Sequence, residues 1–188
     1  DLYPMAVPDA QGGSASAADL RRGATLVYRH FLSLSNELQT PKIVLCPSDG
    51  LGRVEAVNWS TNRTRGRDAA QYFAGNSSVS YFVGFEADET LPQSLLSGDR
   101  NITNSDRTDI SRGIVFRFRM RARRNDPPPL PTPEPGWDKN IHDTAGNVAL
   151  GDGSVQAFSS SKLREGIRDM GIQEVQLAVP GDEDERGR

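Results

Sequence analysis

Histidine and cysteine are rare in this chain, which contains two His and one Cys among 188 residues. His142 precedes the pair Asp152-Gly153, with nine residues between them. An imidazole in this position can donate a hydrogen bond to a carbonyl or a carboxylate, so we predict that His142 folds back and ties its loop to the turn at Asp152. A lone His and a lone Asp lack the nucleophile, third ligand or second carboxylate of a reaction centre. We therefore predict an architectural role for His142.

Cys46 and His30 also lack suitable partners nearby in the sequence. Cys46 ends the apolar run Ile43 to Leu45; it is either a reactive thiol or a small buried residue, and we predict the second because free cysteines are usually buried. We predict that His30 lies at the solvent edge or the end of a helix. The chain has no His-Glu-x-x-His, no Gly-x-Ser-x-Gly, no phosphate-binding glycine loop and no cysteine pair. We assign no catalytic, cofactor-binding or metal-ligating residue, and we predict that the protein is not an enzyme.

A run of arginines offers an alternative function, the binding of DNA or another polyanion. Its members alternate along one segment or follow it directly, and they are Arg117, Arg119, Arg121, Arg123 and Arg124. Such a stripe can neutralise phosphates, but the aromatic residues between the arginines point to the opposite face of a strand and are not placed to stack on bases. We predict a solvated strand face balanced by acidic neighbours.

Calcium is the one cofactor that the sequence suggests, because two stretches are rich in hard oxygen ligands. The candidate ligands are Asp99, Asn101, Asn104, Asp106 and Asp109 in one stretch, and Glu86, Asp88 and Glu89 in the other. Neither stretch has the regular spacing of an EF-hand. Asp and Asn are also common turn residues, and we predict plain loops.

The element that follows His142 is a β-hairpin. Val148 to Leu150 and Val155 to Phe158 are short apolar or alternating runs, and Gly151-Asp152-Gly153 supplies the positive φ angles of a tight turn. The serines that follow predict an N-cap for a short helix, which ends near Gly171. Val175 to Val179 predicts a last extended segment.

The earlier part of the chain predicts one helix and several strands. Apolar residues recur every three or four positions from Asp19, which predicts a helix lying on a sheet; they are Leu20, Ala24, Val27, Phe31 and Leu34. The predicted strands are Lys42 to Cys46, Val54 to Trp59, Val79 to Phe85, Ser94 to Ser97 and Gly113 to Met120. Turns rather than helices separate them, so we predict an antiparallel sheet. The proline-rich residues 126–135 cannot donate enough hydrogen bonds for a sheet ladder, and we predict a stiff loop there.

Composition indicates one domain with many loops. The chain has 18 Gly and 12 Pro, and its net charge of −3 with a pI near 5.4 argues against a dedicated nucleic-acid binder. We predict a flexible lead-in over residues 1–18, a single globular head over 19–180 and a disordered acidic tail over 181–188. The sequence has no apolar run of the roughly 20 residues that span a membrane.

Four blocks of sequence resemble a known family. They are residues 35–49, which end in Cys46-Pro47-Ser48-Asp49, then residues 80–90, residues 97–101, and the His142-x9-Asp152-Gly153 segment. In this order the blocks are similar to bacterial prepilin-type, pseudopilin-like proteins with a His-x9-Asp-Gly signature, of the kind abundant in Verrucomicrobia. The resemblance covers residues 31–180.

The resemblance implies a pilin-like α+β fold, in which an N-terminal helix packs on an antiparallel sheet with long loops, a C-terminal hairpin and a short helix. It also implies a non-enzymatic structural subunit of a type II secretion or type IV pilus-like filament, involved in protein transport. The family carries an apolar N-terminal membrane helix that this sequence lacks, so we expect the chain to be a head domain without its anchor.

The implied partners are other pilin or pseudopilin subunits, an exported protein substrate, and the inner membrane through the missing helix. Nucleic acid is not expected as a partner. The implied location is the periplasmic head of a single-pass inner-membrane protein or an extracellular filament.

Overall fold

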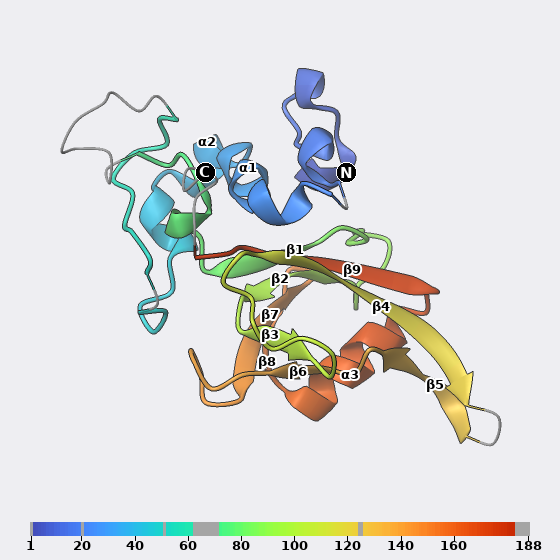
Figure 1. Ribbon diagram of the computed structural model, residues 1–188. Helices are drawn as coiled ribbons and strands as arrows, with labels where there is room; N and C mark the ends of the chain where they lie inside the picture. Colours follow the sequence, from blue (N-terminus) through green and yellow to red (C-terminus); the bar gives the residue numbers. More distant parts are fainter. Residues whose placement is uncertain (1, 20, 51, 62–71, 124–125, 183–188) are drawn as a thin grey trace.

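A seven-stranded antiparallel sheet forms the centre of the protein in the computed structural model, which describes residues 2–19, 21–50, 52–61, 72–123 and 126–182. The strand order is β5-β4-β9-β1-β2-β7-β8, and the sheet curls into a half-barrel (Figure 1). Two further strands, β3 and β6, pair as a separate antiparallel ribbon.

The strands are β1 Tyr81–Gly84, β2 Leu95–Asp99, β3 Ile102–Asn104, β4 Ile114–Arg123, β5 Asp126–Thr132, β6 Pro135–Trp137, β7 Ala145–Leu150, β8 Val155–Ser159 and β9 Glu174–Val179. The α-helices are α1 Val27–Leu32, α2 Ser35–Leu38 and α3 Ser160–Asp169. Single turns of 3-10 helix occupy Pro4–Ala6, Asp9–Gln11, Ala15–Ala17, Gly23–Thr25, Pro41–Val44 and Asn76–Ser78.

The sheet is buried on both faces, because its central strands contribute apolar side chains to two cores. Phe82 and Leu177 point into one core, and their neighbours Val83 and Ala178 point into the other. Successive strand residues face opposite sides of a sheet, so strands that are apolar at every position need a cover on both. Helix α3 and the β3–β6 ribbon cover the first core. The short N-terminal turns and helix α1, which begins at Val27, cover the second (Figure 1).

The predicted pilin-like α+β fold is wrong. The structure is mostly antiparallel sheet with three short α-helices in its described part, and no N-terminal helix lies packed along the sheet. The helical pattern that begins at Asp19 breaks into the 3-10 turn Gly23–Thr25, then α1 and then α2. No side chain caps α1 or α2. Helices this short have little stability of their own, so packing against the sheet decides where each turn lies.

The sheet and its hairpin are confirmed. Strands β1, β2 and β4 fall within or over the predicted segments, and all pairings within the seven-stranded sheet are antiparallel. β7 and β8 pair as the predicted hairpin, and Gly153 in its turn has φ +81°. The segment expected from Val175 to Val179 is β9, a central strand rather than an appendage.

Two predicted strands and one predicted loop are wrong. Lys42 to Cys46 is largely a 3-10 turn started by Pro41, and Val54 to Trp59 contributes only an isolated bridge from Asn58 to Tyr72. The proline-rich segment is a strand, β5, that pairs with β4. It lies at the edge of the sheet, where a residue without an N–H group can face away from the ladder.

The C-terminal helix is confirmed with its caps. The Ser159 hydroxyl accepts a hydrogen bond from the backbone N–H of Lys162, and Gly171 has φ +70° just beyond the last turn. Leu163 and Ile167 of this helix are fully buried. None of the helices in the described part of the chain is long and apolar enough to cross a membrane.

The two ends of the chain contribute to the fold where they are described. Met5 and Ala17 of the expected lead-in are buried. Asp182, in the expected acidic tail, pairs with Arg53 and Arg100. Residues 183–188 lie outside the described residues, as do Leu20 and Arg124.

Candidate functional site

Three consecutive residues at the end of β2 organise the candidate site: Asp99, Arg100 and Asn101. All three are about 1% exposed. The strand reaches this point through Gly98, where a Cβ atom would lie 2.6 Å from the backbone oxygen of Asn147 and 2.7 Å from the ring of Phe82. The absence of a side chain at Gly98 therefore allows β7 and the Phe82 ring to approach closely.

Asp99 meets Cys46 and His142 in one cluster. The Nε2 atom of His142 lies 3.7 Å from the Sγ atom of Cys46 and 3.3 Å from the Oδ2 atom of Asp99. The backbone N–H and the side-chain amide of Asn147 both donate to Oδ2 of Asp99, at 2.6 and 3.1 Å. Burial raises the pKa of the neighbouring Tyr81 to about 12, and the charges of Cys46, Asp99 and Asp49 add to the rise.

Asn101 holds the loop that carries His142. Its side-chain amide donates to the backbone oxygens of Asp138 and Ala145, the two ends of that loop, at 3.2 and 3.1 Å. Its own backbone oxygen accepts from the N–H of Asp138. Just after His142, Asp143 and Thr144 have φ angles of +48° and +68°. Non-glycine residues adopt such angles only where the surrounding structure enforces them, so the loop is held in a single shape.

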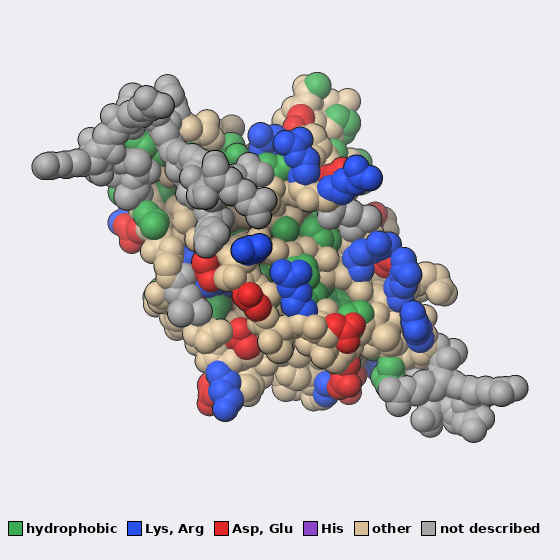
Figure 2. Space-filling view, in the orientation of Figure 1, with side chains coloured by type: hydrophobic (Ala, Val, Ile, Leu, Met, Phe, Trp, Pro, Cys, Tyr) green, Lys and Arg blue, Asp and Glu red, His purple; other side chains and the backbone are tan. Residues whose placement is uncertain are grey.

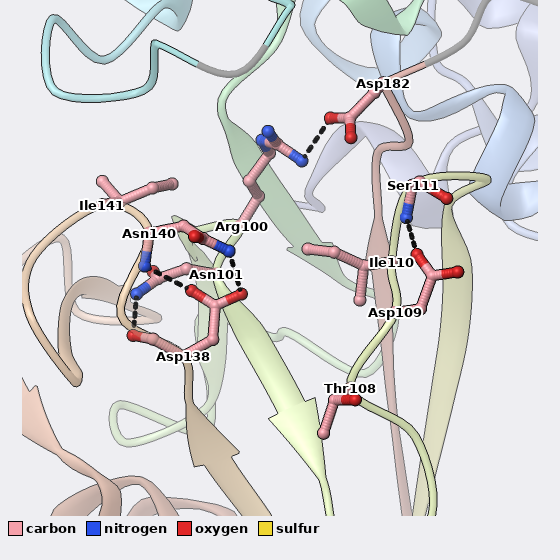
Figure 3. A pocket seen from close by; sticks show the side chains of 10 residues that line it. All are labelled: Arg100, Asn101, Thr108, Asp109, Ile110, Ser111, Asp138, Asn140, Ile141 and Asp182. Atoms are coloured by element: carbon pink, nitrogen blue, oxygen red, sulfur yellow. Dashed lines mark hydrogen bonds and ion pairs between the residues drawn. The ribbon is translucent and has the colours of Figure 1, made fainter.

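Arg100 holds the turn that carries Cys46. Its guanidinium donates to both carboxylate oxygens of Asp49, at 2.6 and 3.0 Å, and pairs with Asp182 at 2.8 Å. Arg53 completes the network through Asp49 and Asp182, at 3.2 and 2.9 Å. Figure 3 shows Arg100 directed toward Asp182 while the adjacent Asn101 is directed toward Asp138. Burial alone raises the pKa of Asp49, but the hydrogen bond and charge of Arg100, with the charge of Arg53, outweigh it and lower that pKa.

The geometry of the cluster differs from that of a nucleophile with its base. In such a triad the nucleophile contacts one ring nitrogen of the histidine and the orienting carboxylate contacts the other. Here Cys46 and Asp99 face the same nitrogen, Nε2 of His142. The nitrogen, the sulfur and the carboxylate oxygen together form a group of three possible metal ligands. Such a set suits coordination better than proton relay.

The predicted contact between His142 and the Asp152 turn is wrong. His142 lies before the first residue of β7, and the turn follows the last, six residues later. A strand rises about 3.3 Å per residue, which separates the two by roughly 20 Å. The hairpin places His142 at its open end, beside Asp99 of the neighbouring strand β2. The Asp152 carboxylate instead accepts a hydrogen bond from the N–H of Ser154.

The structure also tests the predictions for the other two reactive side chains, Cys46 and His30. Cys46 is buried as predicted, at 7% exposure. His30 lies in the last turn of α1, as the helix-end alternative predicts, but it is buried, so the solvent-edge alternative is wrong. Its Nδ1 lies 2.7 Å from the hydroxyl oxygen of Ser14, and its ring lies against Phe85. Burial lowers the pKa of His30 to about 4.

Several of the oxygen ligands considered for calcium are engaged in turns. Asp88 accepts from the N–H of Thr90, and Asp109 accepts from the N–H of Ser111. The side-chain oxygen of Asn104 accepts from two successive backbone N–H groups. Among the described residues, Cys46, Asp99 and His142 form a group whose possible metal-ligand atoms lie close together.

The arginine stripe on β4 is partly compensated. Glu174 on the adjacent strand β9 accepts from both Arg117 and Arg119, at 2.7 to 2.9 Å. The intervening Phe116 and Phe118 are buried and stacked on each other. Figure 2 shows basic side chains gathered over the part of the surface where β4 lies.

Sequence reasoning missed the cluster although each member lies in one of the resembling blocks. Cys46 belongs to the first block, Asp99 to the third and His142 to the fourth, and the second block supplies Ser80, whose backbone oxygen accepts from the N–H of Arg100. The order of the blocks was visible, but their convergence depends on strand pairing. No family model, curated protein or solved structure matches the chain.

Proposed function

We propose that the chain is a non-enzymatic structural subunit of a prepilin-type assembly, such as a type II secretion pseudopilus or a type IV pilus-like filament. One observation carries the proposal: the four blocks that resemble the prepilin-type family meet in one braced cluster around Asp99, Arg100 and Asn101. Segments far apart in the sequence that together stabilise one cluster are expected in a domain with a structural task.

An apolar groove supplies a surface for subunit contacts. It has a volume of about 370 Å³ and lies between the N-terminal turns and the strands β1 and β2; its lining includes Met5, Phe31, Leu38, Ile43 and Leu96. Ile43 is 56% exposed. A solvent-exposed apolar surface of this kind commonly marks a protein contact. Head-to-tail contacts between identical subunits build open filaments.

The polyanion alternative has weaker support. Glu174 pairs with both Arg117 and Arg119, so part of the positive stripe is already neutralised. A binder of phosphates would need those guanidinium groups available to its ligand.

Photo-crosslinking in cells that express the full gene tests the proposal. A photoreactive residue in place of Ile43 should yield crosslinked multimers of the chain. The same residue in place of Val57, an apolar side chain that is 51% exposed and does not line the groove, is the matched control. Failure of the Ile43 probe to crosslink to another subunit contradicts the proposal.

The gene offers a second test. We expect the reading frame upstream of Asp1 to encode a short basic leader followed by a long apolar segment. An ordinary secretory leader at that place contradicts a prepilin-type subunit and favours a free periplasmic protein.

A further inference from the structure

We propose that Cys46, Asp99 and His142 form a binding site for a borderline transition-metal ion of the Zn²⁺ type. Their donor atoms all lie within 4.8 Å of one another. The donors are a sulfur, an imidazole nitrogen and a carboxylate oxygen, which together select Zn²⁺ over the hard ions Ca²⁺ and Mg²⁺. The inference concerns stability and ligand binding, and it stands independently of the filament proposal.

Two of the three donor separations fit tetrahedral coordination. Bonds of Zn²⁺ to sulfur, nitrogen and oxygen in a tetrahedron place sulfur and nitrogen about 3.5 Å apart, and nitrogen and oxygen about 3.3 Å apart. The corresponding separations are 3.7 Å between Cys46 and His142 and 3.3 Å between His142 and Asp99. The third separation, from the Cys46 sulfur to the Asp99 carboxylate, is within 4.8 Å, against about 3.6 Å in a tetrahedron. An ion held first by His142 and one of these two donors would draw the other toward it.

A single imidazole nitrogen faces both other donors, an arrangement that one metal ion accounts for as well as a hydrogen bond to Asp99 does. A neutral Nε2 either carries a proton, which it can give to one acceptor, or presents a lone pair, which faces the Asp99 carboxylate unfavourably. A cation between the three atoms satisfies the lone pair, the thiolate and the carboxylate together. The double hydrogen bond from Asn147 to Asp99 is the kind of outer contact that orients a ligating carboxylate.

The scaffold holds the three donors close to one another. Asp99 lies at the end of β2, Arg100 fixes the turn of Cys46 through Asp49, and Asn101 fixes the loop of His142. Cys46 and Asp99 are buried, whereas the His142 side chain is 32% exposed. The partial exposure of His142 places one side of the cluster at the surface. A Zn²⁺ ion with three protein ligands commonly takes water as its fourth.

Cobalt titration of the full chain tests the site. Metal is first removed with a chelator, and Co²⁺ is then added as a spectroscopic probe. We expect one equivalent to bind with a thiolate-to-cobalt charge-transfer band and the visible bands of tetrahedral cobalt, and Zn²⁺ to displace it. Binding without the thiolate band, or no binding, overturns the proposal.

His142→Gln is the diagnostic variant, because the side chain is partly exposed and belongs to neither core cluster. We expect its metal affinity to fall at least about tenfold. Asp109→Asn, an exposed carboxylate outside the cluster, is the control and should bind as the unmodified chain does. Equal affinity of His142→Gln and the unmodified chain overturns the proposal.

Alkylation of the unmodified chain gives a second measurement that depends on no variant. Cys46 is the sole cysteine, so a thiol reagent reports on this site alone. Zn²⁺ should slow its alkylation and raise the melting temperature, since an ion that binds the folded state stabilises it. Ca²⁺ should do neither. An alkylation rate that is unchanged by Zn²⁺ counts against the site.

Discussion

The ion pair between Arg100 and Asp49 allows a direct measurement of what burial does to a charge interaction in this protein. Both side chains are almost inaccessible, at 2% and 0% exposure, and the shortest contact between them is 2.6 Å. Lys42 and Glu55 form a pair of nearly the same length, 2.7 Å, but their side chains are 58% and 51% exposed. The two pairs differ mainly in their surroundings.

Replacing Arg100 with Met removes the charge and keeps a long side chain. Asp49 then remains buried with only Arg53 at 3.2 Å to balance it. Removing one partner of a buried pair typically costs about 3–5 kcal/mol, because the charge left behind has lost a partner that no water replaces. This is a large share of the roughly 5–15 kcal/mol that stabilises a whole domain.

The same change at the surface should cost far less. Lys42→Met leaves Glu55 in water, and exposed pairs are worth about 0–1 kcal/mol. For a chain of this size each kcal/mol shifts the melting temperature by about 2–4 °C. We therefore expect Arg100→Met to melt roughly 6–20 °C lower than the unmodified chain, and Lys42→Met to melt within about 4 °C of it.

Urea denaturation followed by circular dichroism gives the free energies, with melting curves as a check. Added salt should weaken the surface pair and leave the buried one almost unchanged, because buried charges are little screened. The reasoning fails if Arg100→Met costs no more than Lys42→Met. In that event the ion pairs around Asp99 to Asn101 do not stabilise the domain, and the support for a structural subunit is lost as well.

Three further changes test local parts of the structure. Gly153→Val should destabilise the hairpin by about 1 kcal/mol or more, because the turn holds φ at +81°; unchanged urea stability would contradict the turn. Ser159→Ala should cost about 1 kcal/mol in the same assay through loss of the α3 N-cap. Burial raises the pKa of Glu86 from 4.5 to about 7, so the folded state holds this proton more tightly and stability falls as pH rises through that window. Glu86→Gln should remove this dependence and gain about 1–2 kcal/mol at pH 8, allowing for solvent screening; stability curves that stay parallel from pH 5 to 8 would refute the shift.

Helical periodicity was the least dependable of the sequence signals. The spacing of Ala24, Val27 and Phe31 is helical, yet the chain forms a 3-10 turn at Gly23–Thr25 and then the six-residue α1. Val27 is fully buried in the second core and Phe31 packs against that core, so the pattern identified part of a buried face. It could not give the length of the helix, because short uncapped helices are held by tertiary contacts.

Rules about proline depend on where a strand lies in its sheet. The local rule predicts a loop for residues 126–135, because proline cannot donate to a ladder. β5 needs hydrogen bonds on one side only, since it pairs with β4 and ends the sheet. Whether a segment is an edge or a centre is a property of the sheet order, which no local window contains.

The sequence by itself determined the elements whose signals are local. The β7–β8 hairpin follows from its glycine turn, α3 from Ser159 and Gly171, and β4 from strict alternation, because each depends on residues within a few positions of one another. Only the tertiary structure decided that β9 is central, that the proline segment is an edge, and that Cys46, Asp99 and His142 meet. Those outcomes depend on strand order and register, which are set by contacts between residues tens of positions apart along the chain.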